Sequence, residues 1–185
     1  MFLAWRPSSA AVDRWLARQA AAPLPPPIGA TGYQVDDNRV VLGSDDACFD
    51  HAREAVRRWD PFRVGWLEVV PDRPAIRVGT TVGVLVHHLG LWSLNASRIV
   101  AVIDEPARFG FVYRTLDDHS LDGDERFTVA RGSADGAVTY EILARSRPRH
   151  ALARLGHPVV RRLQRRFARD SMLAMLGIAM ANAQR

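Results

Sequence analysis

The sequence predicts an α+β fold in which a curved antiparallel sheet of about seven strands grips a long C-terminal helix. Apolar residues in the last stretch, 150–185, recur at steps of three and four, which places them on one helical face. From Val64 onward, short segments alternate or form apolar runs, and turn residues separate them. Because these connections are short, neighbouring strands are expected to be antiparallel. A long amphipathic helix needs cover for its apolar face, and the sheet supplies that cover.

An N-terminal helical arm with a proline-rich linker is expected over residues 1–32, and a single domain over 33–185. Residues 9–22 are predicted to be helical, with Ser9 as the cap, and the proline run that follows cannot continue a helix. Trp5 and Trp15 are large apolar side chains on this arm. They predict that the arm docks on its own domain or on a second subunit.

A short strand is predicted at 39–42, and a helical insertion follows it. Ser44 is expected to cap this helix, with the carboxylates of Asp45 and Asp46 in its first turn, near the positive helix end. Cys48 falls on the apolar face of the helix, which favours a buried and inert thiol. Because it is the single cysteine, no internal disulfide can form, and a reducing, cytoplasmic location is expected.

The remaining strands are separated by clusters of proline, glycine and aspartate that are typical of turns. The apolar stretch 90–95 is interpreted as a loop whose side chains need to be covered by the core, a ligand or a partner.

Strands do not alternate with helices and no glycine-rich phosphate loop occurs, which argues against a nucleotide-binding fold. Gly156 and Pro158 predict a break near the start of the final helix. The expected strands are 64–70, 79–87, 97–104, 109–116, 125–130 and 138–145.

The order of elements is strand, helical segment, six strands and long helix. This order resembles the helix-grip arrangement of START, Bet v 1 and polyketide-cyclase proteins. The resemblance implies a strongly bent sheet around the C-terminal helix, often with a cavity between them. Carriers, enzymes and co-chaperones share this arrangement, so it implies no particular activity.

Six short strings follow one another along the chain: VVLG at 40–43, WDPF at 59–62, HLGLWSLN at 88–95, RFGFVYRTL at 108–116, GDERF at 123–127 and SRPR at 146–149. In this order they resemble a family of bacterial and plant proteins that is catalogued only as a domain of unknown function. The resemblance covers about residues 33–175 and leaves out the N-terminal arm. It implies a stand-alone domain and carries no catalytic residues to transfer.

The first functional hypothesis is a non-catalytic domain that binds a small apolar or amphipathic ligand between sheet and helix. Aromatic residues alternate onto one side of several predicted strands and could line such a cavity, although aromatic side chains there more often fill a core. A polar anchor is expected at Glu125 or His119. The expected ligand-binding residues are Trp66, Trp92, Phe111, Tyr113, Phe127, Tyr140 and Phe167.

The second hypothesis is a cyclase- or hydrolase-type enzyme in which Glu125 acts as acid or base, with Tyr113 or His119 assisting. An inward carboxylate beside Phe127 would have a raised pKa. Alternatively, Glu125 reaches solvent at the strand end or pairs with an arginine such as Arg149. The loop residue His119 is favoured as a surface side chain, because no second histidine follows at ligand spacing. No metal and no other cofactor is expected.

The third hypothesis is an interaction module for a membrane or nucleic acid. The formal net charge is +5, and all 25 basic residues are arginine. Four of them could form an anion-binding strip on the final helix, but no aromatic residues that would stack on bases are interleaved with them. An ordinary solvated surface is the favoured interpretation. The residues of the proposed strip are Arg161, Arg162, Arg165 and Arg166.

The final helix becomes apolar all round after Asp170, which a sheet on one side does not require. This pattern predicts a further contact with the arm that carries Trp5 and Trp15, or with a second subunit. A homodimer through the arm and the helix end is therefore one expected assembly. No stretch of the sequence is long and apolar enough to span a bilayer.

Overall fold

Seven strands form one antiparallel sheet in the order β2-β8-β7-β6-β5-β4-β3, and the two-residue strand β1 pairs with β5. The computed structural model describes residues 2–23, 26–29, 31–119, 121–149 and 156–183. The sheet stays open, with β2 and β3 at its edges. The strands are β1 (Phe2–Leu3), β2 (Gln34–Ser44), β3 (Leu67–Val70), β4 (Thr81–His88), β5 (Leu91–Glu105), β6 (Arg108–Thr115), β7 (Leu121–Arg131) and β8 (Ala137–Pro148).

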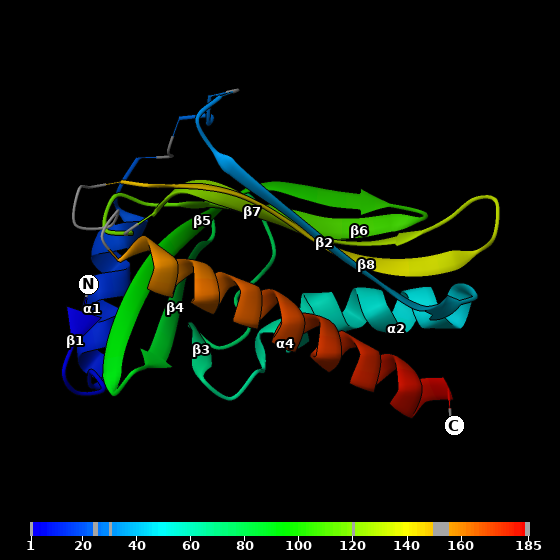
Figure 1. Cartoon of the computed structure of the whole chain (residues 1–185), viewed down its shortest axis with the longest axis horizontal. Helices are drawn as coiled ribbons and strands as arrows, with labels where there is room; N and C mark the ends of the chain where they lie inside the picture. The colour runs from blue at the N-terminus through cyan, green and yellow to red at the C-terminus, as the bar shows by residue number, and fades with distance from the viewer. Residues whose placement is uncertain (1, 24–25, 30, 120, 150–155, 184–185) are drawn as a thin grey trace.

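The helix α4 (His157–Ala183) runs across the inner face of the sheet, as predicted. Figure 1 shows β4 turned away from the plane of β6, β7 and β8, so that the sheet bends around the helix. The helix α2 (Asp46–Arg57) lies beside the C-terminal half of α4 and contacts the same face, and the 3-10 turn η1 (Asp60–Phe62) follows it. The expected antiparallel helix-grip architecture is confirmed.

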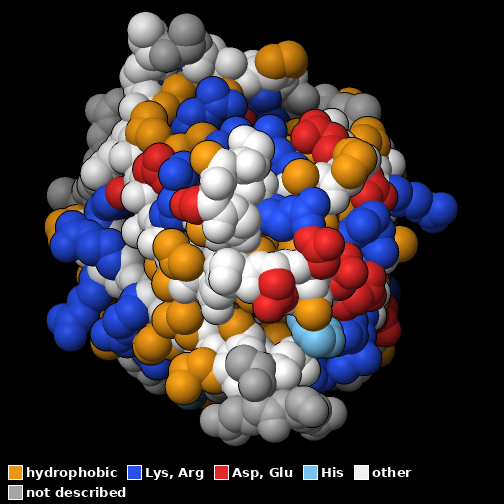
Figure 2. All heavy atoms as spheres, turned by 90° about the vertical axis from the view of Figure 1, so that its right-hand side faces the viewer, with side chains coloured by type: hydrophobic (Ala, Val, Ile, Leu, Met, Phe, Trp, Pro, Cys, Tyr) orange, Lys and Arg blue, Asp and Glu red, His pale blue; other side chains and the backbone are white. Residues whose placement is uncertain are grey.

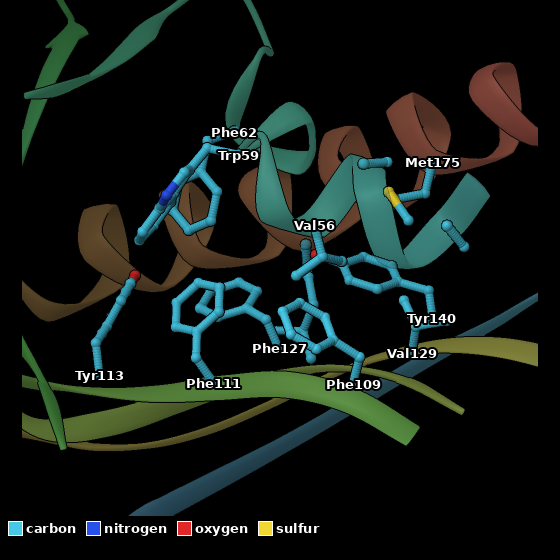
Figure 3. Close-up of a cluster of buried hydrophobic side chains, with 14 of the residues drawn as sticks. Val56, Trp59, Phe62, Phe109, Phe111, Tyr113, Phe127, Val129, Tyr140 and Met175 are labelled. Carbon is cyan, nitrogen blue, oxygen red and sulfur yellow. The ribbon is translucent and has the colours of Figure 1, made fainter. Parts of the chain in front are cut away.

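The main core lies where α2 and α4 meet the strands β6, β7 and β8 (Figure 3). Phe111 and Phe127 stand on the sheet with exposed fractions of 1% and 0%, and Trp59 packs on Phe111 at 4.7 Å between ring centroids. Met175 of α4 is also fully buried. Aromatic rings dominate this contact, because alternate residues of the three strands point toward the helices.

The helix α1 (Ser9–Ala20) packs on the opposite, outer face of the sheet. Val12 and Trp15 are buried there against residues of β4 and β5. A β-carbon on Gly83 would lie 3.0 Å from the Trp15 ring, so the glycine leaves room for the indole. Ser8 caps the helix, accepting from the Ala11 amide, where Ser9 had been expected. Through Trp15 the arm docks on its own domain.

Arg98 of β5 fastens the end of α1 to the sheet. Its side chain is only 5% exposed and donates to the carbonyl oxygens of Gln19 at 2.5 Å, Ala20 at 3.1 Å and Ala22 at 2.5 Å. Carbonyls at the end of a helix lack the full set of helical partners, and the guanidinium supplies donors to them, although the Gln19 carbonyl also accepts from the Ala22 amide at 3.2 Å. Burial lowers the pKa of Arg98.

The interpretation of 90–95 as a loop is wrong, because β5 already begins at Leu91. Leu89 and Gly90 form a tight turn with φ of 51° and 74°, and β4 and β5 pair up to this turn. This two-residue turn fixes the pairing register of β4 with β5. The strand β1 then pairs with the start of β5, where β6 does not reach.

Two further boundaries differ from expectation. The strand predicted at 39–42 is the longer β2, which pairs along most of β8. Asp45 caps α2 through a 2.7 Å bond from the Cys48 amide, where Ser44 had been expected. The Cys48 thiol is half-buried against the core, and burial raises its pKa.

The apolar end of α4 is covered by α2 on the inner side of the sheet. The expectation that the N-terminal arm covers this end is wrong, because α1 lies on the outer face, at the other end of the molecule (Figure 1). Leu173 and Met180 keep 58% and 63% of their surface exposed. Trp5, on the arm, is 83% exposed.

Candidate functional site

A cavity of about 570 Å³ lies between the sheet and the N-terminal half of α4. It adjoins the main core, and Phe62 and Phe167 mark the boundary between the two. Most of its surface is apolar. The lining residues are Phe62, Trp66, Leu67, Val84, Val86, His88, Ser93, Asn95, Ser97, Tyr113, His119, Leu121, Glu125, Gly156, Val159, Val160, Leu163, Gln164 and Phe167.

The sheet side of the cavity carries a row of polar side chains, here called the polar row: Ser93, Asn95, Ser97, Tyr113 and Glu125. The first three are alternate residues of β5, so they share one face of the strand. Tyr113 on β6 stands directly opposite Glu125 on β7 in the strand register. Polar groups from three adjacent strands therefore converge on the same space.

The helix side of the cavity is mainly apolar. Val159, Val160, Leu163 and Phe167 occupy one side of α4, following its helical repeat. Trp66 closes the cavity from the segment before β3. Its indole nitrogen donates to Asp170 at 3.0 Å, and the Arg166 guanidinium lies over its ring at 4.6 Å. A molecule held here would meet polar groups on one side and apolar groups on the other.

Glu125 and Tyr113 form the central polar pair of the site. The Tyr113 hydroxyl donates to Glu125 Oε2 at 2.7 Å. Burial raises the pKa of Glu125, the hydrogen bond from Tyr113 opposes this rise, and the carboxylates of Asp124 and Asp36 add to it. Burial and the adjacent carboxylate also raise the pKa of Tyr113 well above its ordinary value. The pair can exchange a proton with a bound molecule or accept hydrogen bonds from it.

Two histidines line the cavity in their neutral form near neutral pH. Burial, with a contribution from the positive charge of Arg149, lowers the pKa of His119 to about 4. Its Nδ1 accepts from the Leu121 amide at 3.0 Å, which leaves the proton of the neutral ring on Nε2. Burial, and the neighbouring His87, also lower the pKa of His88. His119 is thus part of the cavity, whereas the sequence favoured a surface loop.

The structure brings together five of the residues singled out from the sequence, namely Trp66, Tyr113, His119, Glu125 and Phe167. Glu125 faces the cavity, and Arg149 pairs with Asp117 and Asp122. The other aromatic candidates do not line the cavity.

Phe111, Phe127 and Tyr140 belong to the packed core under α2 and α4. The Tyr140 hydroxyl bonds to Ser171 at 2.9 Å inside that core. Trp92 lies on the outer face of the sheet, where it stacks on His87 at 4.5 Å between ring centroids. It points away from the cavity because Ser93, its neighbour in the strand, points into it.

Ser93, Asn95, Ser97 and Gln164 were missed from the sequence. Ser93 and Asn95 fell in the stretch interpreted as a loop. Alternation assigns side chains to one face of a sheet only within a strand, so it was not applied to them. The alternation S-x-N-x-S over 93–97 was the available signal. It becomes meaningful only once β5 is known to be continuous from Leu91.

The four arginines of the expected anion-binding strip do not form one surface. Arg161 is buried and pairs with Asp36 of β2, with one N–O distance of 2.6 Å. Arg166 lies on Trp66 and near Asp170. Arg162 and Arg165 are exposed. Figure 2 shows the end of the molecule near the C-terminus of α4, where basic, acidic and apolar side chains are interspersed.

Within the described part of the chain, no three His, Cys, Asp or Glu side chains gather in a way that could hold a metal ion. Over the same residues, no helix reaches the length and apolar character needed to cross a bilayer.

The fold of the chain is found in solved structures of low sequence identity. One is a point mutant of norcoclaurine synthase from Thalictrum flavum in complex with a transition-state analogue, which is 12% identical with a TM-score of 0.53. The match covers 84% of this chain and 99% of that one. At this identity the likeness shows a shared fold.

Two relatives are much closer in sequence, and both are described as UPF0548 proteins. The one from Dictyostelium discoideum is 36% identical over 157 residues, which cover 79% of this chain and 73% of the relative. The one from Deinococcus radiodurans is 34% identical, covering 91% of this chain and 94% of the relative. A family model described as "Domain of unknown function (DUF1990)" matches residues 16–174. The resemblance seen in the six sequence strings is confirmed, although the match begins within the N-terminal arm that the strings left out, and the chain belongs to the DUF1990 family.

Proposed function

We propose that this protein binds a small amphipathic molecule in the cavity between the sheet and α4. The observation that carries the proposal is the cavity itself, which has a volume of about 570 Å³ and a mainly apolar lining. Sites for small molecules commonly fall in the range of about 300–1,000 Å³, with a few polar groups that fix orientation. The polar row and the two histidines supply such groups.

The helix side of the cavity provides the test, because one substitution there can fill the space. Leu163→Trp places an indole in the cavity, whereas Leu173→Trp places the same group on an exposed position of the same helix. Titration with Nile red, an uncharged dye that fluoresces in apolar surroundings, should show binding to the unchanged protein and to Leu173→Trp. Binding to Leu163→Trp should fall at least about tenfold.

Equal dye binding by the two tryptophan variants would place the dye elsewhere and refute the proposal. Native mass spectrometry of the freshly purified protein gives a second measurement. A co-purified small molecule should be present on the unchanged protein and on Leu173→Trp, and reduced or lost on Leu163→Trp.

A second candidate function is catalysis by Glu125. It is favoured by the 2.7 Å bond from the Tyr113 hydroxyl to Glu125 and by burial, which raises the pKa of that carboxyl inside a cavity. A carboxyl group held in this way can transfer a proton to or from a bound molecule. The likeness to norcoclaurine synthase supports only that this fold can hold a catalytic site.

The substitution Glu125→Gln separates binding from catalysis. The glutamine side chain would keep an acceptor for Tyr113 and nearly the same volume, but it cannot exchange a proton. The protein and this variant would each be incubated with a small-molecule extract of the host cells, followed by mass spectrometry. A metabolite consumed by the unchanged protein and not by the variant supports catalysis. Equal consumption by both would show a reaction that does not use Glu125, and consumption in neither sample supports binding alone.

A further inference from the structure

The charges around the cavity restrict which molecules it can hold, an inference that rests on the proposed ligand binding. The chain has 25 arginines, yet none of the described residues that line the cavity is an arginine. The nearby guanidinium of Arg161 donates to Gln164 at 2.9 Å from behind the lining, and it is neutralised by Asp36. Arg149, whose charge acts on His119, pairs with Asp117 and Asp122. Among the described lining residues an anionic ligand would therefore meet no cationic side chain, and burying an anion in apolar surroundings without one is costly.

The histidines of the cavity do not change this balance. His119 has a pKa of about 4, and the pKa of His88 is lowered as well, so both are uncharged near neutral pH. Their rings can offer hydrogen bonds without offering a positive charge. The carboxyl group of Glu125 is the titratable acid of the lining, and when ionised it makes the cavity negative.

Glu125 also has unused capacity to accept hydrogen bonds. A carboxylate has two oxygens and about four acceptor positions. Within the described residues its hydrogen-bond partner is the Tyr113 hydroxyl, which binds Oε2. On β5, Ile99 stands opposite Tyr113, and Ser97 and Asn95 follow two and four residues further along the strand, where they also line the cavity. Their side-chain oxygens are further acceptors on the same side of the cavity.

A protonated amine matches this arrangement. An ammonium group has three donors and no acceptor, so it can pair with one carboxylate and bond to neighbouring oxygens at the same time. The apolar side chains of α4 would cover the rest of such a molecule. We propose that the ligand is an amphipathic cation, with an amine held by Glu125 and an apolar body held against α4.

Three probes with the same ten-carbon chain test this proposal: decylamine, 1-decanol and decanoate. Each would be titrated against the complex of the protein with Nile red near neutral pH, and dye displacement measured. Decylamine should bind about ten- to a hundredfold more tightly than 1-decanol, the range expected for a hydrogen bond to a charged group. Decanoate should bind most weakly. The net charge of +5 attracts an anion such as decanoate to the protein surface. This general attraction would strengthen decanoate binding, so it cannot be the cause of a weakest affinity for decanoate.

The substitution Glu125→Gln should weaken decylamine to the level of 1-decanol and leave 1-decanol unchanged. Glu105→Gln is the matched control, because it makes the same chemical change at an exposed position of the same sheet. It should leave all three affinities unchanged. The probe series on the unchanged protein decides the matter even if Glu125→Gln does not fold.

The outcomes separate the two proposals. If decanoate or 1-decanol binds as tightly as decylamine, the cation proposal is overturned while ligand binding stands. An unchanged decylamine affinity in folded Glu125→Gln has the same meaning. If Nile red itself does not bind in the cavity, the proposed function fails, and the cation proposal fails with it.

Discussion

The inner face of the sheet meets α4 in two regions that differ in how the space between them is filled. Toward the C-terminal end of the helix, α2 lies alongside and the core is fully packed around Phe127 and Met175. Toward the N-terminal end, α2 is absent, and the cavity remains between Leu163 and the polar row. The comparison teaches that α2, and not the sheet or α4, decides where the cavity lies.

The boundary between the two regions is set by how α2 ends. The helix stops at Arg57, and Trp59 takes a left-handed conformation with φ of 62°. The chain then turns through η1, which places the Phe62 ring 5.0 Å from Phe127 and 5.1 Å from Phe167. Phe62 therefore belongs to the core and lines the cavity at the same time.

The largest expected difference between the regions is in stability. Phe127→Ala should lower the free energy of unfolding by about 3–5 kcal/mol, because it leaves a void in a packed core. Leu163→Ala should cost less than about 2 kcal/mol, since its side chain already borders empty space. Chemical denaturation measures both. Equal losses would show that the cavity region is as tightly packed as the core.

An intermediate effect is expected at the ion pair that ties α4 to β2 near the cavity. The Arg161 side chain is 9% exposed and its partner Asp36 is 25% exposed. Arg161→Met removes the cation and leaves a partly buried carboxylate without it, which should cost about 2–3 kcal/mol. The exposed neighbour Arg162→Met should change stability by less than about 0.5 kcal/mol.

The two losses are compared by the same denaturation measurement. If Arg162→Met is as destabilising as Arg161→Met, the four arginines act as one surface strip and not as separate contacts. In that case the ion pair with Asp36 would not be the reason that this end of α4 is held in place.

The smallest expected effect is a dependence of stability on pH that comes from the cavity region. The pKa of His119 is about 4 in the folded protein and about 6.5 in an unfolded chain. The unfolded chain thus binds the extra proton first, so stability is lost as the pH falls from about 6.5 through 4. Because part of the ring faces the cavity and stays accessible, we expect a loss of about 1–2 kcal/mol.

His119→Gln provides the comparison for this pH effect. Other acidic and basic groups also contribute to the pH dependence of stability, so the difference between the two proteins is the informative quantity. The decline between pH 6.5 and 4 should be shallower in the variant by about 1–2 kcal/mol. Thermal or chemical unfolding across this pH range checks it, and parallel curves would show that the histidine is solvated.

The architecture could be predicted from sequence because its signals are local. The helical repeat of α4, the turn residues between strands and the helical insertion each act within a few residues. The alternation that pointed Phe127 inward also allowed an inward Glu125, but a solvent-facing strand end or a pair with an arginine remained the alternative, and the structure places Glu125 in the cavity lining. The two face the same side of β7, yet one lines the cavity and the other is fully packed.

The division between cavity and core could not be predicted, since it depends on contacts between distant parts of the chain. Phe111 and Tyr113 alternate identically on β6 and both belong to the core, yet Tyr113 also lines the cavity and Phe111 does not. The polar row was missed for a related reason. Its members come from β5, β6 and β7, and the register that brings them together is a property of the assembled sheet.

The three carbonyl oxygens held by Arg98 have a consequence for motion. If α1 were to swing away from the outer face, it would strip the guanidinium of its acceptors and uncover Trp15 together with the apolar strand surface beneath it. The hydrogen bonds of Arg98 and the burial of Trp15 would be lost together, so a partly released helix would not be a stable intermediate. The amides of α1 should therefore exchange with solvent through a single opening of the whole helix, and Arg98→Met should speed that exchange.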